Sequence, residues 1–357
     1  MKSLGKFPDP FIAEISGQPE ALRRAADGLA DQARQLGALA DRRGGVLVFA
    51  GMGSSYDACY PAVTTLGRHG TTAFMVDAAE LLHFRLGMFG APDDVVFVSQ
   101  SGESAETVRA AEELRTRSDG PRIFAVTNDP TSSLADAAEI TLQTNAGEES
   151  GPSTITFAAA LVVVGAVAQA ALGTRPNDVA QRIALEADRT ADTIAGLVAD
   201  RALPDRLVAW HGGRATTVIL GRGAARAAAE MGALTIKEAA GMPVESLQAA
   251  QFRHGPLELA GPDLAAIVLA TEPETAELDL ELGAELARLG SAVLLVTTDG
   301  PAPVGAMSMS IPIGSLDRLL SPAAAVVPAQ LLAWRLSVTS GRTPGSYVHA
   351  SKVTTRE

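Results

Sequence analysis

The stretch Val95–Ser104, with the sequence VVFVSQSGES, joins an apolar run to a loop that contains serines and one glycine. A helix-type segment from Ala105 to Leu114 follows at once. A strand, a serine-rich turn and a helix start in this order can form an anion site, because free backbone N–H groups and hydroxyls point at the ligand. The stretch predicts a phosphomonoester site, although serines that only cap the helix would leave the same pattern.

Strand-type and helix-type segments alternate through the first half of the chain, after a helical pattern over residues 9–42. This alternation predicts a doubly wound α/β sheet that is parallel and covered by helices on both faces. Ligands of such sheets bind at the carboxyl ends of the strands, and the loops 51–55 and 99–104 both lie there. The five expected strands are 46–50, 73–76, 95–98, 122–126 and 139–142.

The second half of the chain echoes the first at an offset of about 170 residues. Residues 217–225 resemble 47–55, and residues 267–272 resemble 96–101. This self-similarity predicts a duplicated domain, with an N-terminal copy over 1–175 and a C-terminal copy over 176–357. Alanine, threonine and glutamate replace the serines in the second copy, so we expect it to keep the scaffold without the phosphate site.

Composition excludes several classes of protein. The chain has 357 residues, a net charge of −12 and a pI of about 5.0, which makes nucleic acid a poor partner. Cys59 is the single cysteine, so an internal disulfide is impossible and a reducing cytoplasm is favoured. The first residues lack the apolar core of a signal peptide. The uncharged segment 155–173 is interpreted as a buried helix rather than a membrane span.

We expect no metal and no organic cofactor. The five histidines are scattered without ligand spacing. Gly51 and Gly53 follow the first strand, but the third glycine of a dinucleotide fingerprint is absent.

Three further motifs follow the serine loop along the chain. They are GALTIKE at 232–238, RHGP at 253–256 and SKVT at 351–354. On residue type alone, Glu238 would be a solvated helix residue and His254 a turn histidine. Together with the loop 99–104, the motifs resemble the double sugar-isomerase (SIS) domain family, which includes the isomerase half of glucosamine-6-phosphate synthase and stand-alone deaminase-type relatives. The resemblance implies two tandem flavodoxin-like SIS domains, each with a five-stranded parallel sheet.

The resemblance also implies a sugar-6-phosphate substrate and a role for each matching residue. Glu238 would move a proton between C1 and C2, and His254 would open the sugar ring from the neighbouring subunit of a homodimer. Lys352 would form a Schiff base with the open-chain sugar, so that pyridoxal phosphate is not needed. The implied substrate and phosphate contacts are Ser54, Ser55, Ser99, Gln100, Ser101, Ser104 and Ser153.

Two departures limit what the resemblance implies. Thr235 stands where the synthase has a lysine, and Gln251 where the family usually has a glutamate. No glutaminase-type segment is recognised, so we expect an amino-sugar-6-phosphate isomerase or deaminase rather than a synthase. The alternatives are a lyase that dehydrates a substrate such as N-acetylglucosamine-6-phosphate, a ketoamine-6-phosphate deglycase, and a sugar-phosphate sensor without turnover.

Overall fold

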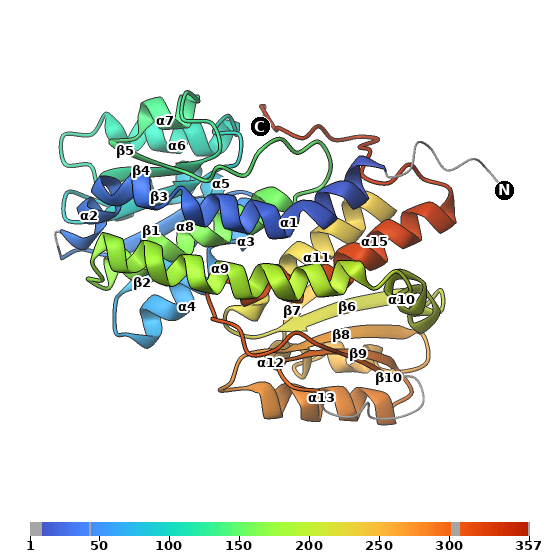
Figure 1. Ribbon diagram of the computed structural model, residues 1–357. Helices are drawn as coiled ribbons and strands as arrows, with labels where there is room; N and C mark the ends of the chain where they lie inside the picture. The colour runs from blue at the N-terminus through green and yellow to red at the C-terminus, as the bar shows by residue number, and fades with distance from the viewer. Residues whose placement is uncertain (1–8, 43, 301–307, 356–357) are drawn as a thin grey trace. The chain divides into compact units, whose positions relative to one another are not determined.

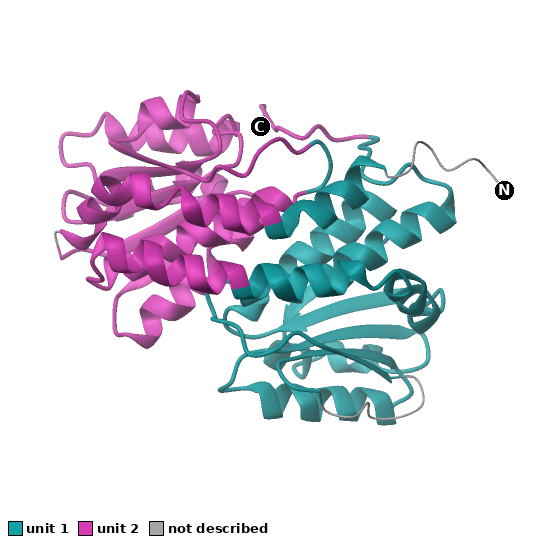
Figure 2. Cartoon of the chain, viewed as in Figure 1, with its two compact units in different colours: residues 1–19, 150–152, 189–348 teal, residues 20–149, 153–188, 349–357 magenta. Residues whose placement is uncertain are grey.

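The computed structural model of the protein describes residues 9–42, 44–300 and 308–355. Its chain forms two compact units (Figure 2). Unit 1 comprises the described residues within 1–19, 150–152 and 189–348, and unit 2 those within 20–149, 153–188 and 349–357. Two long helices, α1 (Pro10–Asp27) and α9 (Pro176–Ala199), each contribute residues to both units.

A five-stranded parallel sheet forms the centre of unit 2, in the strand order β2-β1-β3-β4-β5 (Figure 1). Three of the strands, β1, β3 and β4, are buried along their whole length, which explains their largely apolar sequences. The five strands expected from the first half are therefore confirmed. Their bounds are β1 (Leu47–Gly51), β2 (Ala73–Asp77), β3 (Asp94–Val98), β4 (Arg122–Thr127) and β5 (Ile140–Gln143).

Helices cover both faces of this sheet. Successive strand residues point to opposite faces, so Val95 and Phe97 reach one apolar cluster, to which α6 also contributes. The helix α8 packs against β4 on the other face. The helices of unit 2 are α2 (Ala33–Ala40), α3 (Ser54–Asp57), α4 (Tyr60–Arg68), α5 (Ala78–Glu80), α6 (Ala105–Arg115), α7 (Ser133–Ala137) and α8 (Ile155–Ala171).

The uncharged segment forms α8, and it is a core helix. All of its residues from Ile155 to Ala170 are buried. Within the described ranges, the structure has no helix with the length and apolar character that a membrane crossing requires.

The expected single helix over 9–42 is wrong, because it breaks at Gly28. α1 ends at Asp27, and a short 3-10 turn (Ala30–Gln32) precedes α2. A Cβ atom at Gly28 would lie 2.2 Å from the side-chain nitrogen of Asn145, so this backbone comes too close for a longer residue. The side chain of Gln32 pairs with both the N–H and the carbonyl of Gln143 on β5, at 2.6 and 3.0 Å.

Unit 1 contains a second five-stranded parallel sheet, in the order β10-β9-β8-β6-β7. This order matches that of the first sheet, strand for strand, when the strands are taken in chain order. The duplication read from the sequence is thus confirmed at the level of the fold. The bounds are β6 (Thr216–Gly221), β7 (Glu245–Gln248), β8 (Leu264–Ala270), β9 (Ala292–Thr297) and β10 (Ser308–Pro312).

The two edge strands of this second sheet have no apolar run. β7 has the sequence ESLQ and β10 the sequence SMSIP, and both are only partly buried. Two helices, α9 and α10, connect α8 to the first strand of this sheet. The other helices of unit 1 are α10 (Leu203–His211), α11 (Ala225–Ala240), α12 (Ala249–Phe252), α13 (Ala276–Arg288), α14 (Ser321–Ala325) and α15 (Val327–Ser340).

His211, the last residue of α10, makes the stability of the fold depend on pH. It is buried, and its Nε2 lies 3.0 Å from the hydroxyl of Thr217 on β6. Burial, assisted by the charge of Arg214, lowers the pKa of His211 below its ordinary value. Below a pH of about 6.5, the unfolded chain therefore binds more protons at this residue than the folded chain does.

We expect the free energy of unfolding to fall as the pH drops below about 6.5 and to keep falling until the lowered pKa is reached. His211→Gln should flatten this part of the profile, and His349→Gln, at an exposed histidine, should not. Urea unfolding between pH 5 and pH 8 measures the slope. An unchanged slope in His211→Gln would contradict the assignment.

Candidate functional site

The serine loops of unit 2 start side by side at the carboxyl edge of its sheet. β1 and β3 pair in parallel, with Gly51 opposite Val98, so the chain leaves both strands at the same level. Ser54 and Ser55 begin α3, and Ser104 precedes the first residue of α6. The sheet thus brings together the two loops that the sequence pointed to.

The loop 99–104 is fixed by its own hydroxyls and by β4. The hydroxyl of Ser99, a residue only 2% exposed, accepts the N–H of Gly102 at 3.1 Å and lies 3.3 Å from the hydroxyl of Ser104. The hydroxyl of Ser101 accepts the N–H of Glu103 at 3.1 Å. The carbonyl of Gln100 accepts from the loop that follows β4, so the turn is held from two sides. These bonds fix the loop in one conformation and engage the N–H groups of Gly102 and Glu103 with the loop's own hydroxyls.

A narrow pocket opens beside these loops within unit 2. Its volume is about 10 Å³, roughly the room that one water molecule needs. Ser54 on its wall is hydrogen-bonded to Ser153, hydroxyl to hydroxyl, at 2.9 Å. The lining residues are Ser54, Ser55, Val98, Gln100, Val126, Thr144, Thr156, Phe157 and Ala160.

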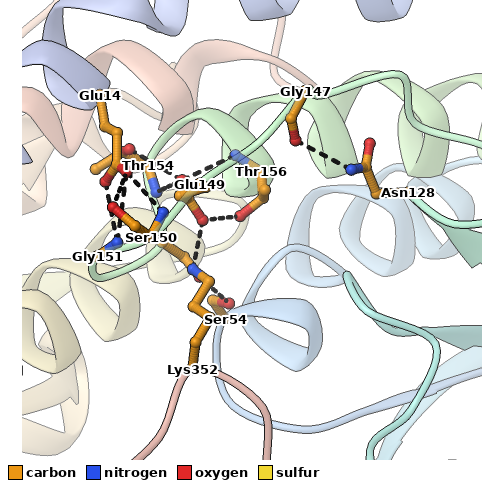
Figure 3. Close-up of polar contacts among 11 residues, drawn as sticks. Glu14, Ser54, Asn128, Gly147, Glu149, Ser150, Gly151, Thr154, Thr156 and Lys352 are labelled. Atoms are coloured by element: carbon orange, nitrogen blue, oxygen red, sulfur yellow. Dashed lines mark hydrogen bonds and ion pairs between the residues drawn. The ribbon is translucent and has the colours of Figure 1, made fainter. Parts of the chain in front are cut away.

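Glu149 is the buried acidic group of this region, and its side chain has no exposed surface. One carboxylate oxygen accepts from the N–H and the hydroxyl of Thr154, at 2.7 and 3.0 Å, and from the N–H of Thr156 at 3.2 Å. The other accepts from the hydroxyl of Thr156 (Figure 3). These donors lie at the start of α8, where the helix dipole favours a negative charge.

Lys352 reaches the same carboxylate from the C-terminal tail, whose residues 349–357 belong to unit 2. Its Nζ lies 2.5 Å from a carboxylate oxygen of Glu149 (Figure 3). The same Nζ lies 3.5 Å from the hydroxyl of Ser153. The carbonyl of Thr354 accepts the N–H of Ala105, the first residue of α6, at 3.2 Å. An amine from the tail, two hydroxyls and the serine loops therefore surround one region of unit 2.

Asn128, which follows β4, holds the loop that leads to Glu149. Its side-chain oxygen accepts the N–H of Ala146 at 2.7 Å and the hydroxyl of Thr144 at 3.2 Å, and its nitrogen donates to Gly147 at 3.0 Å (Figure 3). Neither Asn128 nor Glu149 was predicted from the sequence as a residue of the site. The available signal was the acidic pair Glu148 and Glu149, which lies shortly before the uncharged segment that forms α8.

Glu238 and His254 belong to unit 1. Glu238 is partly buried in the last turns of α11, and His254 is exposed just after α12. Thr235, at the position of the synthase lysine, is fully buried, and its hydroxyl donates to the carbonyl of Met231 at 2.8 Å. This hydroxyl is therefore engaged with the backbone of its own helix.

The corresponding edge of the second sheet holds a carboxylate from its own chain. Gly223 repeats the positive φ of Gly53, at 52° against 50°. Glu272 occupies the place of Ser101, and a Cβ atom on Gly223 would lie 3.1 Å from its carboxylate. Arg318 donates to Glu272 at 2.7 Å and to Glu274 at 2.5 Å. An internal anion thus occupies the region where the first copy presents its serines.

A family model described as the SIS domain matches residues 42–170 and 214–340. The glutamine–fructose-6-phosphate aminotransferase (isomerizing) of Pyrobaculum aerophilum is 29% identical over 364 residues, which cover 100% of this chain and 59% of the relative. The chain thus spans about six-tenths of the length of that relative.

Two solved structures share the fold. The C-terminal domain of glucosamine-fructose-6-phosphate aminotransferase from Francisella tularensis has a TM-score of 0.81 and 21% identity, and the alignment covers 95% of this chain and 98% of that one. Glucosamine-6-phosphate deaminase from Thermotoga maritima has a TM-score of 0.73 and 18% identity, with coverage of 97% and 99%.

Gly102→Ala should destabilise the protein by at least ~2 kcal/mol, because the residue has a φ of +67° and a Cβ atom there would lie 2.0 Å from the hydroxyl of Ser132. Thermal unfolding measures the loss. Gly67→Ala is the matched control, because its φ is not positive and a Cβ there would meet nothing within 4 Å. Equal melting temperatures for the two variants would show that the loop 99–104 is not constrained as described.

Glu272→Ala should cost ~1–3 kcal/mol, because it removes a buried partner of Arg318. Glu274→Ala removes the more exposed partner of the same arginine and should cost less than ~1 kcal/mol. Urea unfolding of both variants gives the comparison. Equal losses would mean that Glu272 is no more important than a surface charge.

Proposed function

Because this chain belongs to the SIS domain family, we propose that it is an enzyme that acts on an amino-sugar-6-phosphate, as an isomerase or a deaminase. The observation on which this rests is the position of Lys352, whose amine lies beside Ser153 in the unit that holds the serine loops. An anion-binding loop and an amine in one region suit a substrate that has a phosphate at one end and a carbonyl at the other.

In this proposal the first SIS domain binds the phosphate. Ser99, Gln100, Ser101 and Ser104 supply donors from the loop before α6, and Ser54 and Ser55 supply donors from the loop after β1. Ser153 contacts the sugar near Lys352. The amine forms an imine with the open-chain carbonyl, and the positive iminium makes the adjacent C–H more acidic.

The second SIS domain supplies the proton transfers. Glu238 moves the proton between C1 and C2 as a general base and acid. His254 opens the ring, because an imidazole can take and return a proton near neutral pH. We further propose that the protein is a cytoplasmic homodimer and that each subunit donates its His254 to its partner. Relatives named as an isomerizing aminotransferase and as a deaminase support the amino-sugar substrate.

A lyase is the second candidate, and Thr235 favours it. Its hydroxyl is bonded to the backbone, so no amine or free hydroxyl is available there to return a proton to the sugar. Proton abstraction at C2 without efficient return would favour loss of the C3 hydroxyl as water.

Mass spectrometry of the protein with glucosamine-6-phosphate, and separately with N-acetylglucosamine-6-phosphate, distinguishes these reactions. Ammonia release from the first substrate would identify the deaminase, and a change of sugar at constant mass the isomerase. Loss of 18 mass units, the mass of water, from either would identify the lyase. If both compounds stay unchanged, the amino-sugar proposal is wrong.

Glu238→Gln should lower kcat by ~10²-fold or more and leave sugar-phosphate binding within a few-fold, because the amide keeps the shape but cannot act as a base. Steady-state kinetics and calorimetry measure the two effects. Glu281→Gln, at an exposed glutamate of α13, is the control and should keep full activity. An active Glu238→Gln enzyme would remove Glu238 from the mechanism.

A further inference from the structure

Glu149 has a role beyond the residues implied by the family resemblance. We propose that Glu149 positions the amine of Lys352 and accepts its proton when the amine attacks the sugar carbonyl. This inference rests on the proposed function, in which Lys352 forms an imine. Its starting point is the 2.5 Å contact between the Lys352 Nζ and the Glu149 carboxylate.

The carboxylate is held in a fixed orientation. Thr154 and Thr156 donate four hydrogen bonds to it, two from backbone N–H groups and two from hydroxyls. Three of the four reach one oxygen, Oε1, and the hydroxyl of Thr156 reaches Oε2. Lys352 also binds Oε2, so the threonines aim this oxygen at the amine (Figure 3).

Burial of the Glu149–Lys352 pair favours the docked position of the C-terminal tail. The Glu149 side chain is fully buried and that of Lys352 is 19% exposed. A buried carboxylate without a cation is costly, so Glu149 favours the docked position of Lys352. The docked amine also lies 3.5 Å from Ser153, whose hydroxyl is bonded to Ser54. Glu149 thereby places the nitrogen next to the hydroxyls that face the sugar in the proposed function.

The contact also gives the Lys352 ammonium a nearby group that can accept its proton. An ammonium has no lone pair, so Lys352 must lose a proton before its nitrogen can attack a carbonyl carbon. Oε2 of Glu149 takes that proton and becomes a carboxylic acid. The nitrogen then forms the C–N bond, and the π electrons of the C=O bond move to oxygen, which receives a proton from the nitrogen.

The second half of the step returns the proton. Glu149 protonates the hydroxyl of the carbinolamine, the C–O bond breaks and water leaves. The nitrogen lone pair forms the C=N bond of the iminium, and Glu149 is again a carboxylate. Charges and atoms balance, and the step needs no group other than the sugar carbonyl.

The first test uses no sugar. Acetic anhydride acylates free amines, and mass spectrometry of peptides gives the rate at Lys352. Glu149→Gln should raise this rate at least ~10-fold, because the amide no longer holds Lys352 in its docked position, where its side chain is only 19% exposed to the reagent. Glu148→Gln is the matched control, since it makes the same substitution at the neighbouring exposed glutamate, and it should leave the rate unchanged. Equal rates for the wild type and Glu149→Gln would overturn the pairing.

The second test traps the imine with borohydride, using glucosamine-6-phosphate and fructose-6-phosphate as probes. Intact mass gives the adduct rate, and calorimetry with inorganic phosphate checks the serine loops. Glu149→Gln should trap at least ~10²-fold more slowly at pH 7 and bind phosphate within threefold of the wild type. Its trapping rate should approach that of the wild type as the pH rises to 10, because solvent base then removes the proton.

The outcomes separate this inference from the proposed function. Trapping at the wild-type rate in Glu149→Gln would overturn the inference. Slow trapping that alkaline pH does not restore would also overturn it, because Glu149 would then only support the structure. Suppose instead that the wild type traps neither sugar, while Ser101→Ala abolishes phosphate binding. That pair of results would overturn the imine step of the proposed function and leave the phosphate site standing. The acylation rates would still decide whether Glu149 pairs with Lys352.

Discussion

The parallel pairing of β1 with β3 is the constraint on which the candidate site depends. Both strands are buried along their whole length, so their polar loops can only emerge at the ends. Because Gly51 lies opposite Val98, the two serine loops emerge at the same level of the sheet. The loop 99–104 then uses its own hydroxyls to fix its backbone before any ligand arrives. A site built in this way has little conformational entropy left to lose on binding.

The two halves of the chain show how one scaffold can keep or lose such a site. Both sheets have the same strand order, and both have a positive-φ glycine after the first strand of the sheet. In unit 2 that glycine is followed by Ser54 and Ser55. In unit 1 the corresponding glycine lies beside Glu272, whose charge is paired with Arg318. The second copy therefore holds a carboxylate of its own at the edge where the first copy presents serines.

The sequence predicted most of the fold, because buried parallel strands appear as apolar runs. It did not show β7 and β10, whose polar edge positions leave no such run. It also missed the break at Gly28, which depends on the distant Asn145. The serine loops could be predicted from their own short stretches of sequence, whereas Lys352 was identified only from the family resemblance. The acidic pair before α8 did not show that Glu149 would differ from Glu148, since burial distinguishes the two and burial is a property of the folded chain.

Each compact unit contains an end segment from the opposite half of the chain. Residues 9–19 belong with the second repeat, and residues 349–355 belong with the first. The two repeats have therefore exchanged their ends, so no single cut in the gene would yield one complete copy. A fragment that stops at residue 188 would contain the serine loops without Lys352. The two halves have the same strand order, but each compact unit is completed by residues from the opposite end of the chain.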